Sequence, residues 1–153
     1  MLSSRFKHYN EIDVVYVCPY CRNKDPFIAD KFFGLTAHVK RIHVKNNDCK
    51  CPVCGATFRS PLGLHRHFEA MNDADHLTAK FFYGLNQHRN SRLKQMLRTI
   101  AYSNTKTYVR RWITLKCPNC NIVTFFMRIK RLIYRCKKCG YTIEIPLSEV
   151  KVI

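Results

Sequence analysis

Eight of the nine cysteines stand in four Cys-x-x-Cys pairs, and this pairing is the strongest chemical signal in the sequence. The pairs are Cys18/Cys21, Cys51/Cys54, Cys117/Cys120 and Cys136/Cys139. Two thiolates at that spacing can bind one metal ion from a single tight turn, and the donor sets expected here are typical of zinc. Because zinc needs deprotonated thiols, the pattern predicts a reducing, intracellular compartment.

The first pair is followed by two histidines at helical spacing. Sixteen residues separate Cys21 from His38, and four separate His38 from His43. Leu35 precedes His38 by one helical turn, so we expect it to pack beneath the metal. The sequence therefore predicts a zinc site formed by Cys18, Cys21, His38 and His43.

The second pair has a clear first histidine and a distant second one. Twelve residues separate Cys54 from His67, and Ser60-Pro61 provides a good N-cap and first helical residue. His76 follows nine positions after His67, nearly on the opposite face of a continuous helix, so the helix must end before it. We predict the ligands to be Cys51, Cys54, His67 and His76. Asp73, Cys49 or an open position, which would suggest catalysis, are the alternatives for the fourth place.

The third set contains cysteines only. Fifteen residues separate Cys120 from Cys136, and the runs 122–129, 132–136 and 141–146 are rich in β-forming residues. We predict a zinc site formed by Cys117, Cys120, Cys136 and Cys139 in a three-stranded antiparallel sheet with a basic tip at 128–131. Gly140 suits the tight turn that such a site requires.

These sets resemble known zinc modules. The series Cys51-x2-Cys54-x3-Phe58-x5-Leu64-x2-His67 matches the Cys₂His₂ zinc-finger family at each step, although the first set has a longer span between cysteine and histidine. The third set resembles zinc ribbons of transcription factors and RNA polymerase subunits. The chain is also similar to small tandem-finger regulators of viruses of heat-loving archaea. The resemblance implies a small α+β chain holding three Zn²⁺ ions, with two ββα fingers (14–45 and 49–76), a basic helical bridge (77–109) and a ribbon (110–148).

The charge is concentrated in the second half. Residues 77–153 contain 16 Lys/Arg against two Asp/Glu, which is +14 of the total +17. Such an excess favours a polyanionic partner, most often nucleic acid. No apolar run is long enough for a membrane span, and the N-terminus lacks the apolar centre of a secretion signal. A solvated basic surface is the simpler alternative.

The bridge is predicted to be helical over 77–102, with a break near Asn90-Ser91. Its apolar side would contain Leu77, Phe81, Phe82, Leu85, Met96, Leu97 and Ile100. A narrow opposite stripe would contact phosphates and contains Lys80, Gln87, Ser91, Lys94 and Arg98. His88 is expected to be a packed or surface histidine rather than a ligand.

The finger resemblance also implies which residues face DNA bases. The reading positions are Lys31, Gly34 and Ala37 in the first finger and Ser60, Gly63 and Arg66 in the second. Only Lys31 and Arg66 can make strong contacts with guanine, so we expect modest specificity and affinity from phosphates.

The sequence therefore predicts a double-stranded-DNA-binding regulator. The alternatives are docking on RNA polymerase and RNA binding, with bases stacked on Phe125, Phe126, Tyr134 and Tyr141. An enzyme is disfavoured. The His67–Glu69 stretch with Cys117 and Cys120 superficially resembles zinc deaminases, but the proline before their first cysteine is absent.

Overall fold

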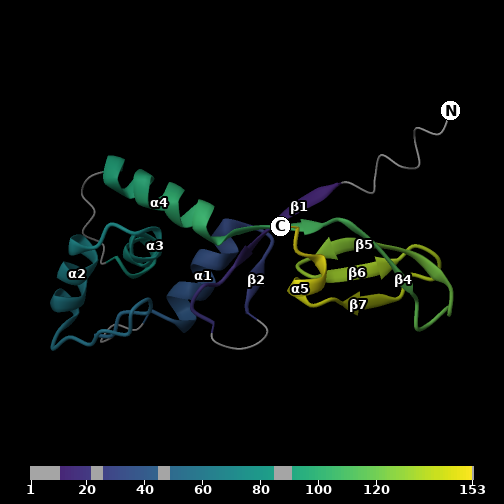
Figure 1. The fold of residues 1–153 in the computed structure, drawn as a ribbon, viewed down its shortest axis with the longest axis horizontal. Coiled ribbons are helices and arrows are strands. Elements are labelled where there is room, and N and C mark those ends of the chain that lie inside the picture. The colour runs from purple at the N-terminus through teal and green to yellow at the C-terminus, as the bar shows by residue number, and fades with distance from the viewer. Residues whose placement is uncertain (1–10, 22–25, 45–48, 85–90, 153) are drawn as a thin grey trace.

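The computed structural model describes residues 11–21, 26–44, 49–84 and 91–152, which form a small α+β fold. All helices except the short last one gather at one end, a four-stranded sheet forms the other, and β1 to β3 lie between them (Figure 1). In chain order the elements are β1 (Ile12–Val17), β2 (Ile28–Ala29), α1 (Phe32–Ile42), α2 (Pro61–Ala70), α3 (Ala74–Tyr83), α4 (Ser91–Thr105), β3 (Lys106–Arg110), β4 (Trp112–Lys116), β5 (Val123–Lys130), β6 (Ile133–Cys136), β7 (Thr142–Glu144) and α5 (Leu147–Val150). Among the described helices, none has the length and apolar character that crossing a membrane requires.

Two antiparallel sheets organise the fold. The first has the order β2-β1-β3 and the second has the order β4-β5-β6-β7. In the first sheet, Ile12 pairs with Arg110 and Tyr16 pairs with Lys106, so the chain beside the first metal-ligand set is joined to a strand far along the sequence. Residues 106–109, predicted to belong to the helical bridge, are therefore part of a strand, β3 (Lys106–Arg110).

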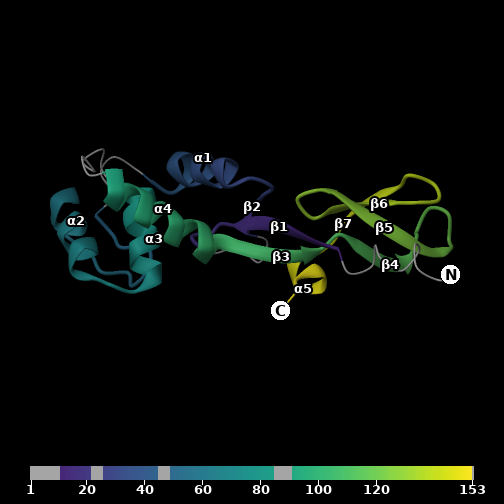
Figure 2. The ribbon, with the colours of Figure 1, turned by 90° about the horizontal axis from the view of Figure 1, so that it is seen from above.

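Side chains of the first sheet alternate between two cores. Val15 and Val17 point toward the four-stranded sheet, where they pack with Phe126 and its neighbours. Tyr16 points the other way and packs with Phe32 and the helices. This alternation is the period-two pattern of a strand that is covered on both faces. The sheet of β1 to β3 thus lies between the helical end and the β-rich end, as the view from above also shows (Figure 2).

The bridge contains two helices, and α4 begins at Ser91, at the predicted break. α3 begins at Ala74, ahead of the predicted start, and ends at Tyr83. The predicted apolar side is wrong at Met96, which is half exposed, because α4 buries Leu97 and Ala101 at a spacing of one turn instead. The predicted positions Leu85, Gln87 and His88 lie outside the described residues.

The second sheet has four strands, where the sequence predicted three. The additional strand, β4, lies before the first cysteine and pairs with β5, with Ile113 opposite Phe126. Phe126 and Tyr134 are fully buried in the core between the sheets. The prediction that both rings could stack on RNA bases is therefore wrong, because neither ring face reaches solvent.

Ion pairs join the first sheet to the second. The Asp13 carboxylate accepts hydrogen bonds from Arg111 at 2.8 Å and Arg128 at 2.7 Å, and Arg128 also donates to Asp30 at 2.6 Å. Burial alone would raise the pKa of Asp13, but the two arginines outweigh it and hold that pKa below its ordinary value. Arg128, predicted to be part of a basic tip, is therefore committed to internal acids.

Replacing Asp13 by asparagine should lower the free energy of unfolding by about 1.5–3 kcal/mol, because hydrogen bonds to charged groups are lost. The unfolded carboxyl titrates near 3.8 and the folded one lower, so the contribution of this carboxylate is complete above that range and is lost only at more acid pH. Urea unfolding should therefore give the same difference between wild type and Asp13→Asn from about pH 5.5 to 8.

The control for this variant is Glu149→Gln, an exposed position on α5. It should change the stability by less than about 0.5 kcal/mol. An equal loss in the two variants would show that removal of any acid, and not the Asp13 contacts, destabilises this basic chain.

Candidate metal centres

Three groups of four Cys/His side chains converge in the described part of the chain. Within each group the potential ligand atoms all lie within 4.8 Å of one another. The groups are Cys18, Cys21, His38 and His43; Cys51, Cys54, His67 and His76; and Cys117, Cys120, Cys136 and Cys139. These are the three sets that the sequence predicted, and each is positioned to hold a metal ion.

The separations fit ligands around one small tetrahedral ion. With metal–sulfur bonds of about 2.3 Å and metal–nitrogen bonds of about 2.05 Å, tetrahedral angles place sulfur and nitrogen about 3.6 Å apart and two sulfurs about 3.8 Å apart. The observed Cys21–His38 separation is 3.3 Å, Cys54–His67 is 3.4 Å, and the Cys120–Cys136 sulfurs are 3.9 Å apart. A disulfide would require about 2.05 Å between sulfurs, so the four-cysteine group is not a pair of disulfides.

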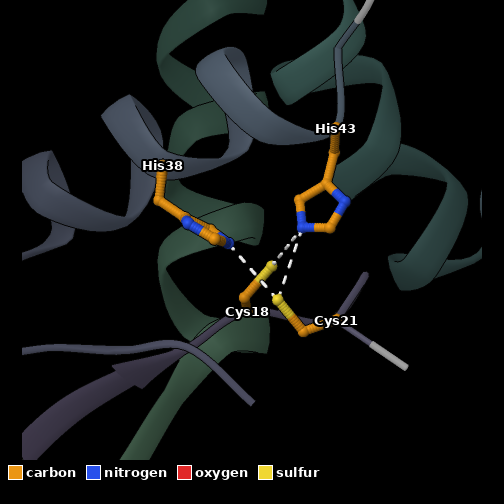
Figure 3. Close-up of side chains that lie close together, drawn as sticks. All are labelled: Cys18, Cys21, His38 and His43. Atoms are coloured by element: carbon orange, nitrogen blue, oxygen red, sulfur yellow. Dashed lines mark hydrogen bonds between the residues drawn. The ribbon is translucent and has the colours of Figure 1, made fainter. Parts of the chain in front are cut away.

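The first group joins the end of β1 to α1 (Figure 3). The Nε2 atom of His43 lies 3.4 Å from the sulfurs of both Cys18 and Cys21. Phe27 stacks on the His38 ring with 3.9 Å between centroids, which fixes the ring plane. Burial lowers the pKa of both histidines, and for His38 the charges of His43 and Arg41 add to the effect. Both imidazoles are therefore neutral at physiological pH, as metal coordination requires.

The other three Cys-x-x-Cys pairs share one turn geometry. In each turn the first cysteine donates its N–H to the carbonyl five residues on and accepts from the N–H four residues on. The residue at that fourth position has positive φ in all three turns and is Gly55, Asn121 or Gly140. Glycine and asparagine are the residues that tolerate this conformation. Only Gly140 was singled out from the sequence, yet the spacing of the other two from their cysteines carries the same signal.

In the second group, the structure shows how the distant histidine, His76, reaches the other three ligands. α2 ends at Ala70, and His76 lies in the first turn of a new helix, α3. The rings of His67 and His76 have centroids 5.1 Å apart at 75°, almost the same as the 5.1 Å and 74° between His38 and His43. Two separate helices thus reproduce the imidazole pair that a single helix provides in the first group.

One orphaned atom supports this assignment. The Nε2 atom of His76 is buried and makes no hydrogen bond of normal geometry with the described residues, although it is close enough to the Cys54 thiol to lower its pKa. A metal ion held with Cys51, Cys54 and His67 would satisfy it. Cys49, an alternative ligand, is not in this group. Its carbonyl instead accepts a hydrogen bond from the backbone N–H of Phe58.

Asp73, the other alternative ligand, contacts His76 on the ring nitrogen that is turned away from the metal position. Its carboxylate contacts the Nδ1 atom of His76 at 2.8 Å and accepts a hydrogen bond from the His76 backbone N–H at 3.1 Å, which caps α3. A carboxylate on the far nitrogen orients a ligand histidine and increases its basicity. Asp73 therefore fixes the tautomer that turns Nε2 toward the metal position.

The thiols differ in acidity within these groups. The His76 side chain, together with the Ala56 backbone N–H, lowers the pKa of Cys54 to about 6, and the Asn119 side chain does the same for Cys139. Burial raises the pKa of Cys18 and Cys120 to about 11. Metal binding must therefore displace protons from Cys18 and Cys120, whereas Cys54 and Cys139 are largely thiolates at neutral pH.

The residues predicted to contact DNA lie on three different helices and one cap. Lys31 is the exposed N-cap of α1, Arg66 is exposed on α2, and Lys94 and Arg98 are exposed on α4. Lys80 is half-buried on α3.

Comparison of the chain with protein-family models, curated proteins and solved structures finds no match. Its function is therefore argued from the metal-ligand groups and the surfaces around them.

The role of Asp73 can be separated from helix capping. Asp73→Ser keeps a side chain that caps α3 but removes the contact with His76 Nδ1. We expect it to weaken metal binding at the second group about 10–100-fold. His76→Ala removes a ligand and should weaken that site further. Both can be measured by competition between the protein and a chromogenic chelator for Zn²⁺, with His65→Ala, on the same helix as His67, as the matched control.

Native mass spectrometry should find three Zn²⁺ ions per chain, because the three groups share no residue. Cys49→Ser should leave this number unchanged. A count of two, with Cys51 and Cys54 open to alkylation in the folded protein, would show that the second group does not hold a metal.

Proposed function

We propose that this chain is a zinc-dependent DNA-binding protein that regulates transcription inside the cell. The first two groups would be ββα zinc fingers and the third a zinc ribbon. Zinc is supported by the donor chemistry, since Cys₂His₂ and Cys₄ sets with tetrahedral separations are its usual structural sites. DNA is supported by the surface that these sites hold in place.

The observation that carries the proposal is the outer surface of α1. This helix buries Phe32, Leu35 and Val39 against the core, and its histidines turn toward the first metal-ligand group. The opposite side is exposed at Ala37, Lys40 and Arg41, and the N-cap residue Lys31 is exposed as well. A metal-anchored helix with one free, basic face is suited to lie in a DNA groove.

Internal pairing of acids strengthens this basic surface. Glu11, Asp13 and Asp30 are all bound to Arg111 or Arg128. α1 and α4 contain no acidic residue, so Lys40 and Arg41 on α1 and the Lys94–Arg98 stretch of α4 have no neighbouring acid on their own helix. Unpaired cations on exposed helices are what phosphate contacts require.

The glycines at the predicted reading positions are explained by packing. A Cβ atom added at Gly63 would lie 3.1 Å from the Cβ of Phe58, and one added at Gly34 would lie 3.4 Å from the Cβ of Ala29. Gly63 therefore lets α2 approach Phe58 closely, whereas a Cβ at Gly34 would make an ordinary van der Waals contact with Ala29. Both positions turn toward the chain that precedes their helix, so neither is available for a base contact. We therefore infer that base reading rests on Arg66 and Lys31 and that specificity is modest.

Arg66 separates base reading from charge. Arg66→Ala should cost about 1–3 kcal/mol on a preferred duplex and little on scrambled DNA. Arg66→Lys keeps the charge but loses the planar fork that engages guanine, so it should lose most of the same discrimination. Binding to matched and scrambled duplexes, after selection of a preferred site from random DNA, tests this. Equal losses on all duplexes would show that α2 does not read bases.

Lys94 and Arg98 should act on every sequence alike. The double variant Lys94→Ala/Arg98→Ala should flatten the dependence of log K on log salt by about 2. Lys151→Ala removes an exposed charge beyond α5 and should leave the slope unchanged. These measurements need the full chain, because a fragment of residues 77–153 would separate β3 from β1. An unchanged slope in the double variant would place the phosphate contacts elsewhere.

A further inference from the structure

The two metal-anchored helices have an exposed apolar side chain at the same position. Phe33 on α1 and Leu62 on α2 are each the second residue of their helix, and each stands five residues before the first histidine of its metal-ligand group. Phe33 is 82% exposed and Leu62 is 51% exposed. A single surface hydrophobe needs no explanation, but its repetition at the same place on both helices indicates a shared role.

Both side chains project away from the core. Neither belongs to a hydrophobic cluster in the described part of the chain. Each is followed by buried residues two and six positions later, which at about 100° per residue lie on the far side of the helix. These buried residues are Leu35 and Val39 in α1 and Leu64 and Phe68 in α2. Phe33 and Leu62 therefore stand on the side of each helix that a partner molecule would meet.

Cations lie farther along the same two faces. On α1, Lys40 and Arg41 follow Phe33 by about two helical turns. On α2, Arg66 follows Leu62 by about one turn. All three cations are exposed. One apolar group with positive charge behind it fits a polyanion that has apolar groups in its grooves. A protein partner fits less well, since protein interfaces have larger continuous apolar patches and few lysines.

We propose that Phe33 and Leu62 recognise thymine by packing against its methyl group in the major groove of DNA. The methyl on C5 of thymine is the apolar feature that base pairs present in that groove, and the first residues of a groove-bound helix meet base edges. The proposal rests on the DNA binding proposed above for α1 and α2. It adds apolar base contacts to the hydrogen bonds proposed for Lys31 and Arg66.

Deoxyuridine tests the methyl contact alone, because it keeps the hydrogen-bonding groups of thymine and lacks only the methyl. The full-length, zinc-loaded protein first selects a preferred duplex from random DNA, and each thymine of that duplex is then replaced in turn by deoxyuridine. We expect two positions at which the replacement weakens binding about three- to fivefold, the effect of burying one methyl-sized group.

Variants assign each position to one side chain. In Phe33→Ala, thymine and deoxyuridine should bind equally at one of the two positions while the other keeps its preference, and Leu62→Ala should give the reverse. Phe33→Leu keeps an apolar side chain and should keep most of the preference. Val123→Ala shortens a side chain that is 66% exposed on β5, outside both helices, and is the matched control that should change neither position. Zinc content verifies that each variant is folded.

Three results would overturn the proposal while leaving DNA binding intact. One is a selected duplex on which no thymine differs from deoxyuridine, or a selected site without thymine. Another is an equal loss of affinity on thymine and deoxyuridine duplexes in Phe33→Ala and Leu62→Ala, which would indicate apolar wedges between bases. The third is unchanged DNA binding in both variants, which would assign the two side chains to another partner. Failure to select any duplex would instead contradict the proposed function and this inference together.

Discussion

The pairing of β1 with β3 is the constraint on which the rest of the fold depends. Each metal-ligand group closes within a short stretch of chain, but none of them alone brings the helical end and the β-rich end together. The β1–β3 pairing, with Tyr16 opposite Lys106 and Ile12 opposite Arg110, brings the two ends together. Each face of β1 then packs into a different hydrophobic core. Such non-local pairing is slow to form and costs chain entropy, which gives the locally closing metal sites a clear physical purpose. If metal binding orders each short stretch first, β1 and β3 meet as preformed pieces, and the Asp13–Arg128 contact then joins β1 to β5 of the second sheet.

The metal groups could be predicted from sequence because ligand chemistry is local and specific. Cysteine and histidine spacing identified all twelve side chains that converge, including His76, whose distance from His67 had left alternatives open. Spacing could not show how His76 reaches the other ligands. It does so because it lies on a second helix, α3, which Asp73 caps. The long-range features were missed for a related reason. Nothing in the residues 106–110 marks them as a partner for β1, and the buried faces of Phe126 and Tyr134 depend on strand parity that the sequence alone does not fix.

The charged residues of this chain have two different roles: some form internal ion pairs and others are exposed. Asp13 of β1 and Asp30, after β2, form ion pairs with Arg111 and Arg128. These arginines therefore stabilise the fold and add little to the electrostatic field outside the molecule. The cations exposed on α1 and α4 have no acid on their own helix. The formal charge of +17 is therefore a poor guide to the charge available for binding. The helices α1 and α4 contain only basic charges, whereas Arg111 and Arg128 in the second half are neutralised by ion pairs and are not free to bind phosphate.

Helix α3 connects the first two metal groups, and this has a consequence for how the molecule responds to metal loss. Its first turn carries His76, and its last turn carries Phe82 and Tyr83, which meet Tyr20 edge-on beside His43. The Tyr83 hydroxyl also donates a hydrogen bond to the His43 carbonyl at 3.4 Å. Release of the second metal would free His76, loosen the start of α3, and so withdraw support from the first group at the other end of the same short helix. The two groups are thus parts of one packed unit, so the outer faces of α1 and α2 have a fixed orientation relative to each other.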